Sequence, residues 1–212
     1  LIFQFLLLGL CVEYIESHAK LCKPASRSYM WREGYDTPVN YNDNELNCGG
    51  FGKQWSNLDG QCGVCGDSWE EKIPRSNEAG GTYGLGIIVE EYKQGGILEA
   101  VVQVTANHKG YFEFRICPTN DPKKRATQKC LDQYLLRQIN GETKFDLPKH
   151  NGNFTVKLEL PQYLTCKHCV LQWRYHTGNS FGCFNSNTES CCIGCGPKQE
   201  EFYSCSDIAI TT

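Results

Sequence analysis

The sequence predicts an all-β protein, an immunoglobulin- or fibronectin-like β-sandwich with long disulfide-rich loops. Short segments rich in β-branched and aromatic residues recur from Gly84 onward, with glycine, proline and asparagine between them. Helical periodicity is scarce. The 212 residues include 14 cysteines, a density that favours a cross-linked fold. We find no internal repeat and no linker, so one domain is expected.

The chain begins with an apolar segment, LIFQFLLLGLC, which is shorter than the ~20 residues needed to cross a bilayer. Residues 13–17 then form a more polar exit that ends in a small residue, Ser17. This pattern is typical of a secretory signal peptide. We therefore expect residues 1–17 to be removed and residues 18–212 to form a single domain that starts with His18. The alternative, a short buried helix, would make His18 an ordinary internal histidine.

The cysteine density agrees with an extracellular location, because disulfides persist in oxidising compartments. Cys11 would leave with the leader, so thirteen of the 14 cysteines would remain. This odd number means that one thiol is free, pairs between chains or reflects a sequence error. The glycosylation sequon at Asn153 agrees with secretion.

Two cysteine pairs have spacings that zinc sites also use. They are Cys62 with Cys65, and Cys166 with Cys169, the second pair enclosing His168. In an oxidising compartment such cysteines more often form disulfides than bind zinc.

Residues 22–80 are rich in glycine, asparagine, aspartate and cysteine, and they show little periodicity. We expect a long cross-linked loop region, because loops of this length in a single domain are usually functional.

Strands are expected next. Phe112, Phe114 and Ile116 alternate with more polar neighbours, which is the pattern of a strand buried on one face. The full set of expected strands is 86–90, 97–105, 111–117, 154–160, 170–175 and 207–210.

The net charge of −3 gives no reason to expect nucleic acid or an anionic membrane as a partner. No stretch after the leader is apolar enough to span a membrane, and we expect a monomer. There is no G-x-S-x-G, no H-E-x-x-H, no phosphate-binding loop and no readable pair of catalytic carboxylates. The sequence therefore does not favour a hydrolase.

The sequence has histidines at 18, 108, 150, 168 and 176. His18 differs from the others because, as the expected first residue, it would carry a free α-amine. A free α-amine has an unperturbed pKa of ~7.7–8.0, so a metal can displace its proton near neutral pH. The amine and imidazole of His18 could then chelate one ion, and a second imidazole would complete three nitrogens. Such a set suits copper. His108 closely follows the strand 97–105. If the extended backbone persists there, Ala106 and His108 share a face, and the small alanine leaves room for a small oxidant.

Four motifs occur in order: an expected N-terminal histidine, T-A-N-H at 105–108, L-Q-W-R-Y-H-T-G-N-S at 171–180 and F-Y-S-C-S-D-I at 202–208. Together with C-G-G at 48–50 and C-G-V-C-G-D at 62–67, they resemble the lytic polysaccharide monooxygenases. The resemblance is closest to auxiliary-activity family fifteen, which is common in arthropods, and it covers nearly the whole chain after residue 17.

The resemblance implies a site with one copper ion per chain. The metal ligands fall on His18, through amine and side chain, and on His108, with Ala106 near the axial position. The axial aromatic residue falls on Phe202 or on Tyr203. Related bacterial enzymes place a phenylalanine immediately before a tyrosine, which favours Phe202.

The resemblance also implies the reaction. Members oxidise C1 or C4 of a pyranose with dioxygen or hydrogen peroxide, and an external electron donor reduces the copper. The expected partner is crystalline polysaccharide, chitin first and cellulose a close second.

Further residues are candidates for supporting roles. Gln172 or Arg174 could be the polar residue that steers oxygen species, or could simply support the fold, whereas Trp173 should face the core. Exposed groups that could meet a crystal face are Tyr29, Trp31, Tyr35, Tyr41 and Lys109, and burial in the loop core is the alternative for each.

Two other functions compete with the enzyme. A non-catalytic, secreted, cysteine-rich protein that binds chitin or matrix would need no free amine at His18. A copper storage or delivery protein would favour softer sulfur ligands, and this chain has one methionine, Met30.

Overall fold

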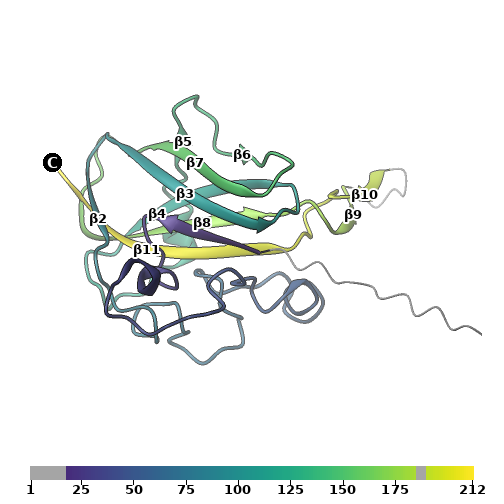
Figure 1. The fold of residues 1–212 in the computed structure, drawn as a ribbon, viewed down its shortest axis with the longest axis horizontal. Coiled ribbons are helices and arrows are strands. Elements are labelled where there is room, and N and C mark those ends of the chain that lie inside the picture. Colours follow the sequence, from purple (N-terminus) through teal and green to yellow (C-terminus); the bar gives the residue numbers. More distant parts are fainter. Residues whose placement is uncertain (1–17, 185–189) are drawn as a thin grey trace, which may run out of the picture.

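The computed structural model describes residues 18–184 and 190–212 and shows two β-sheets packed face to face (Figure 1). The signal peptide expected at residues 1–17 lies outside this range. In the first sheet all neighbours are antiparallel. Its strands, in spatial order, are β1 (His18–Lys23), β3 (Ile97–Ala106), β7 (Gly152–Glu159) and β5 (Arg137–Gln138).

The second sheet has five strands, and only the pair β2 and β11 is parallel. In spatial order they are β2 (Glu90–Lys93), β11 (Glu201–Thr211), β8 (Cys166–His176), β4 (Tyr111–Pro118) and β6 (Phe145–Asp146). A separate hairpin of β9 (Phe181–Cys183) and β10 (Cys191–Ile193) projects from one end of the sandwich (Figure 1). The helical pieces are short: η1 (Met30–Glu33), η2 (Lys53–Asn57) and α1 (Gln128–Leu131).

The core lies between the two sheets, where alternate side chains of each strand point inward. Leu98, Val102 and Val104 of β3 are fully or almost fully buried. Facing them, Phe112 packs edge-on against Trp173 with the ring centroids 5.5 Å apart. Burying side chains of this size contributes about 1.5–3 kcal/mol each. The all-β sandwich expected from the sequence is therefore confirmed.

The expected strands 97–105, 111–117 and 154–160 match β3, β4 and β7 to within two residues. In each strand, buried residues occur at every second position along one face of the sheet, so the period-2 pattern is visible in the sequence. The expected strand 86–90 is wrong, because β2 begins only at Glu90.

The expected strands 170–175 and 207–210 are too short, because β8 and β11 are eleven residues long. In β11 both faces are buried, including the polar residues Ser204, Ser206 and Asp207. A strand covered on both sides shows no alternation of polar and apolar residues. β1 has no counterpart among the expected strands, because it lies between the expected leader and the loop region.

The loop region covers the outer face of the five-stranded sheet, below β11 in Figure 1. Arg27 in this region donates to both carboxylate oxygens of Asp207 on β11, at 2.8 and 2.6 Å. His168 Nε2 lies 3.0 Å from the same carboxylate. Burial alone would raise the pKa of Asp207, but these partners outweigh it and the pKa is lowered. The expected loop region is thus confirmed, except that Cys22 and Lys23 belong to β1.

Cross-links reinforce this cover. The disulfides of the described residues are Cys48–Cys62, Cys65–Cys205, Cys117–Cys130, Cys166–Cys169, Cys183–Cys191 and Cys192–Cys195. Both cysteine pairs with zinc-like spacing are therefore used in disulfides. No cluster of three or more possible histidine, cysteine, aspartate or glutamate ligands occurs in the described residues. Cys22 is the one described cysteine outside a disulfide.

Within residues 18–184 and 190–212, no helix is long and apolar enough to cross a membrane.

Replacing Cys65 and Cys205 by alanine should destabilise the protein strongly, because this disulfide closes a loop with a sequence separation of 140. The chain-entropy relation gives about 5 kcal/mol for a loop of this length. Removing Cys192–Cys195, with a separation of 3, should cost less than about 2 kcal/mol. Urea unfolding of the two double variants measures the difference. Equal losses would contradict the view that the first disulfide fixes the loop region to the sheet.

Candidate metal centre

His18 is placed by strand pairing. It is the first residue of β1 and pairs with Ala106, the last residue of β3. The hydroxyl of Thr105 donates to the carbonyl of His18 at 3.2 Å, which closes this end of the pair. His18 and Ala106 therefore lie side by side at one end of the first sheet.

His108 is placed by a tight turn between β3 and β4. Because β3 ends at Ala106, the argument that Ala106 and His108 share the face of an extended strand does not apply. Instead, Asn107 accepts the backbone N–H of Lys109 at 2.8 Å and donates to the carbonyls of Pro148 and His150 at 2.8 Å. This side chain explains the asparagine of the T-A-N-H motif.

Gly110 completes the turn. It has a φ of 85°, and an added Cβ would lie only 2.0 Å from the carbonyl oxygen of His176. Only glycine fits such a close approach of two backbones.

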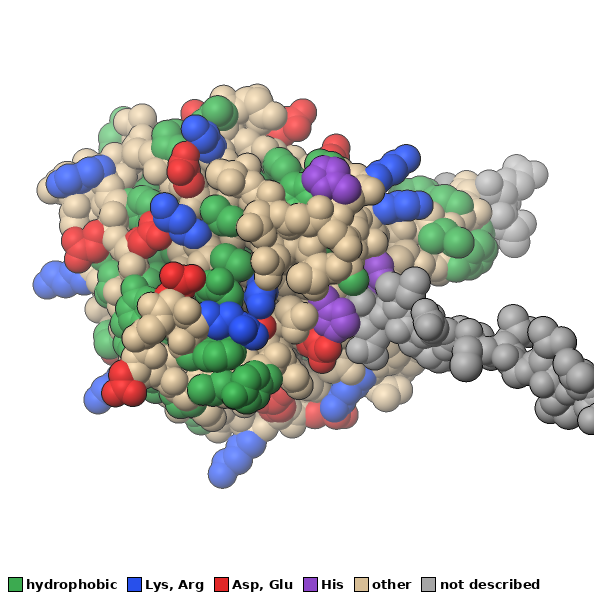
Figure 2. All heavy atoms as spheres, in the orientation of Figure 1, with side chains coloured by type: hydrophobic (Ala, Val, Ile, Leu, Met, Phe, Trp, Pro, Cys, Tyr) green, Lys and Arg blue, Asp and Glu red, His purple; other side chains and the backbone are tan. Residues whose placement is uncertain are grey.

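The backbone of His108 is held on both sides. Its N–H donates to the hydroxyl of Tyr175 at 3.1 Å, and its carbonyl accepts the N–H of Gly178 at 2.8 Å. On the face in Figure 2, histidine side chains gather towards the end of the molecule that carries the β9–β10 hairpin in Figure 1. The backbone of His108 is thus held by β8 and by the turn that follows it.

The hydrogen bonds of the two rings show which nitrogens a metal could use. In the described part of the chain, His18 uses Nε2, which lies 2.5 Å from a carboxylate oxygen of Glu45. His108 uses Nδ1, which lies 2.5 Å from the amide nitrogen of Asn179 and 3.6 Å from Glu200. Nδ1 of His18 and Nε2 of His108 lie outside these contacts. Because an amide N–H donates, Nδ1 of a neutral His108 accepts from Asn179 and the ring hydrogen lies on Nε2. A metal at Nε2 would therefore require this hydrogen to move to Nδ1, where Glu200 could accept it.

This arrangement fits copper. Nδ1 is the imidazole nitrogen that can close a six-membered chelate ring with the amine of the same histidine, whereas Nε2 points away from the backbone. With Nε2 of His108, the donor set would be three nitrogens, which suits copper. The donor set includes a main-chain amine, so it is not a cluster of side chains alone.

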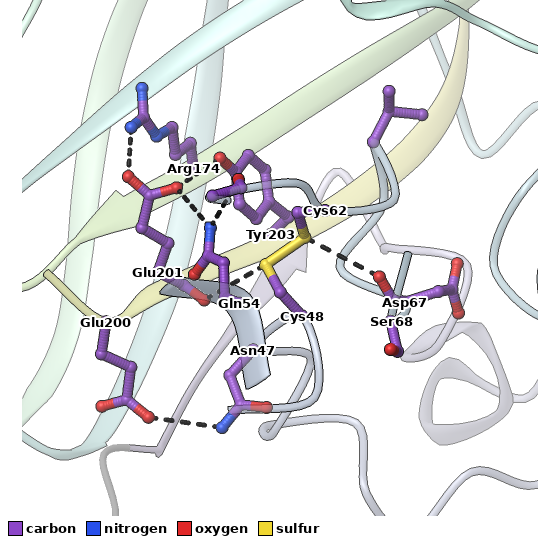
Figure 3. The surroundings of a disulfide bond; sticks show 12 residues. Asn47, Cys48, Gln54, Cys62, Asp67, Ser68, Arg174, Glu200, Glu201 and Tyr203 are labelled. Carbon is purple, nitrogen blue, oxygen red and sulfur yellow. Dashed lines mark hydrogen bonds and ion pairs between the residues drawn. A yellow bond between two sulfur atoms is a disulfide. The ribbon is translucent and has the colours of Figure 1, made fainter. Parts of the chain in front are cut away.

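Phe202 and Tyr203 point to opposite faces of β11. Phe202 pairs with Tyr175 across the sheet, and their rings stack in the core with centroids 5.8 Å apart. Phe202 therefore lies on the same side as the tyrosine whose hydroxyl contacts His108. Tyr203 lies on the loop side, where its hydroxyl donates to Glu201 at 2.6 Å (Figure 3).

Glu201 is the centre of a charged cluster beneath the loop region (Figure 3). It is 2% exposed and binds Arg174, His176 Nδ1 at 2.9 Å and Gln54 at 3.3 Å. Burial alone would raise the pKa of Glu201, but the bond from His176 and the charge of Arg174 outweigh it and lower the pKa to about 2.

Gln172 and Arg174 have contacts that support the fold. Gln172 donates to the carbonyl of Val64 at 2.7 Å, and Arg174 pairs with Glu113 and Glu201. Trp173 between them is fully buried in the core, as expected.

Among the aromatic residues expected at the surface, Tyr41 is 79% exposed. It packs edge-on against Trp31, with ring centroids 5.5 Å apart. Tyr29, Trp31 and Tyr35 are partly buried, and Lys109 is exposed beside His108.

Glu45 and Asn179 are not among the residues expected at the site from the sequence. Asn179 belongs to the motif at 171–180, which is part of the family resemblance, and this membership is the one feature of the sequence that could have indicated it. Glu45 lies in an irregular loop, 27 residues from its histidine partner, and carries no local signal.

Comparison with known proteins decides the family. A sequence model described as "Lytic polysaccharide mono-oxygenase, cellulose-degrading" matches residues 18–208. The chain belongs to the lytic polysaccharide monooxygenase family. It is therefore a copper-dependent monooxygenase that acts on polysaccharide and takes electrons from an external reductant. The non-catalytic matrix-binding alternative is not favoured.

Solved structures agree. One described as "Lytic Polysaccharide Monooxygenase AA15 from Thermobia domestica in the Cu(I) State" is 48% identical, with a TM-score of 0.86, and the match covers 91% of this chain and 98% of that chain. The expected resemblance to auxiliary-activity family fifteen is confirmed. A "chitin binding domain from Burkholderia pseudomallei" is 13% identical, with a TM-score of 0.51 over 92% of this chain and 100% of that chain, and it supports the fold alone. No curated protein matches the sequence significantly.

Replacing Glu201 by glutamine should remove a pH-dependent part of the stability. The pKa of Glu201 is lowered from 4.5 to about 2 in the folded protein. Its contribution is therefore present above pH 4.5 and is lost as the pH falls from 4.5 towards 2. The difference corresponds to roughly 3 kcal/mol. Urea unfolding of wild type and E201Q at pH 7 and pH 3 measures it, with E142Q, a change in an exposed turn, as the control. If the stability of wild type and of E201Q changed equally with pH, the lowered pKa of Glu201 would be contradicted.

Proposed function

We propose that removal of residues 1–17 creates a copper site from the amine and Nδ1 of His18 and Nε2 of His108. The supporting observation is that Glu45 accepts from Nε2 of His18, which leaves the lone pair on Nδ1, while Nε2 of His108 lies outside the contacts of that ring with Asn179 and Glu200. Copper bound there supplies the one-electron chemistry that activates dioxygen or hydrogen peroxide to oxidise C1 or C4 of a pyranose.

The surrounding residues shape this site. Ala106 lies beside His18 in the strand pair, and its methyl group leaves space for a small oxidant. Of the two aromatic candidates, Phe202 is the one proposed to lie beside the copper site, because it faces the side of Tyr175 and His108, whereas the hydroxyl of Tyr203 donates to Glu201. An apolar ring there would offer no donor atom to the metal and would limit the access of water.

The substrate is proposed to be crystalline chitin, with cellulose as the second candidate. Chitin follows from the resemblance to an arthropod-rich family, and cellulose from the description of the matching family. The enzyme is proposed to be secreted and monomeric, and its disulfides agree with an oxidising compartment. Asn153 remains a proposed glycosylation site.

Contact with the crystal face is assigned to Tyr41 and Lys109. Tyr41 precedes by four residues the glutamate that touches His18, and Lys109 follows His108 directly. Both are exposed, so they can meet a flat polysaccharide surface beside the copper site.

Copper binding tests the site first. Secreted protein whose N-terminus is verified as His18 by mass spectrometry should bind one equivalent of Cu(II) and give an axial three-nitrogen paramagnetic resonance signal. His108→Ala should abolish that signal and the release of oxidised sugars from chitin and cellulose, because one of three nitrogens is lost. A chain that starts elsewhere, or loose binding unaffected by this change, would exclude the proposed site.

Substrate contact is tested by Tyr41→Ala. This variant should bind crystalline chitin several-fold more weakly while its Cu(II) affinity stays unchanged, since the ring lies outside the ligand set. Tyr163→Ala is the matched control, because Tyr163 is 99% exposed and follows the end of β7 that pairs with Ile97, opposite to the His18 end. Equal binding by the two variants would show that Tyr41 does not contact the substrate.

A further inference from the structure

Residues 43–47, here called the 43–47 segment, run between β1 and β11. The carbonyl of Asn44 accepts the N–H of Ala19, next to His18, at 3.1 Å. The carbonyl of Leu46 accepts the N–H of Tyr203, next to Phe202, at 3.0 Å. The segment is thus bonded through its backbone to both strands that carry proposed site residues.

Side chains anchor the segment at both ends. The carboxylate of Asp43 is almost fully buried and binds Lys20 of β1 at 3.3 Å and Arg32 of η1. Removing one partner of such a buried pair is strongly destabilising, so this end is fixed. At the other end, Asn47 donates to Glu200 at 3.3 Å, as Figure 3 shows. Glu200 itself lies 3.6 Å from His108.

Glu45 stands between these anchors and faces His18. Its Oε1 lies 2.5 Å from His18 Nε2, and the two side chains are 38% and 25% exposed. A carboxylate only accepts hydrogen bonds, so Nε2 carries the hydrogen and Nδ1 carries the lone pair. A neutral imidazole in this form presents Nδ1 to a metal, and a hydrogen-bonded carboxylate increases the basicity of the ligand.

We propose that Glu45 is a positioning residue for His18, held in place by the anchored 43–47 segment. It fixes the tautomer and the rotation of the imidazole, so that Nδ1 is directed to the copper before the metal arrives. This inference rests on the proposed copper site. His108 is held differently, by a neutral amide and a more distant carboxylate, so the carboxylate effect should be larger at His18.

The test compares Glu45→Ala and Glu45→Gln with wild type in protein whose N-terminus is verified as His18. Glu142→Gln is the matched control, because Glu142 is exposed in the turn between β5 and β6. Cu(II) affinity is measured by competition calorimetry, the ligand set by paramagnetic resonance, and the copper-free fold by thermal unfolding. E45A should lose roughly 10- to 100-fold in affinity. E45Q should lose less, about threefold or more, because its amide oxygen still accepts a hydrogen bond but carries no charge.

Both Glu45 variants should also show a shifted Cu(II) spectrum, while their copper-free unfolding temperatures match E142Q. Wild-type affinity and an unchanged spectrum in E45A would overturn the proposal. If E45A does not fold, E45Q decides, and wild-type affinity with an unchanged spectrum in E45Q has the same meaning. Failure of the copper site itself would be recognised differently, because wild type would then bind Cu(II) loosely and His108→Ala would not change its binding.

Discussion

The antiparallel pairing of β1 with β3 is the constraint on which the site depends. It brings together the first residue of one strand and the last residue of another, His18 and Ala106, and the next turn then supplies His108. A slip of one residue would move every side chain of β1 to the other face of the sheet. Ala19 and Leu21 would then leave the core and the polar Lys20 would enter it, so the hydrophobic core and the site fix the same register. The position of the donor nitrogens is therefore a consequence of core packing.

The second constraint is the loop cover on the five-stranded sheet. Its contacts include the buried ion pair of Arg27 with Asp207, the hydrogen bond from Gln54 to Glu201 and the disulfide between Cys65 and Cys205. Buried charges tolerate few alternative partners, because an unpaired charge in the interior costs several kilocalories per mole. The cover therefore has one well-defined position on the sheet. The 43–47 segment is the part of this cover that contacts β1. Because the cover has one position on the sheet, the segment has one position relative to His18.

The sandwich could be predicted wherever alternation was visible. In β3, β4 and β7, buried residues occur at every second position along one face. The sequence predicted these strands with small errors at their ends. The polar residues of β11 are buried by contacts with the loop region, so no local pattern marks them. The metal ligands could be proposed because a histidine expected at the N-terminus combines an amine and an imidazole in one residue, and because the T-A-N-H motif is part of the family resemblance. Glu45 and Asn179 could not, because their roles are contacts across 27 and 71 residues of chain.

The sequence by itself determined the class of fold, the high density of cysteines, and the family with its copper-dependent chemistry. These depend on composition, on period-2 patterns and on short motifs, all of which are local properties. Only the tertiary structure decided which cysteines pair, which of Phe202 and Tyr203 faces the side of His108, and which nitrogen of each imidazole is already hydrogen-bonded. Each of these is a contact between residues distant in sequence. Such contacts are set by strand register and by the packing of the loop cover, which no local segment of the chain specifies.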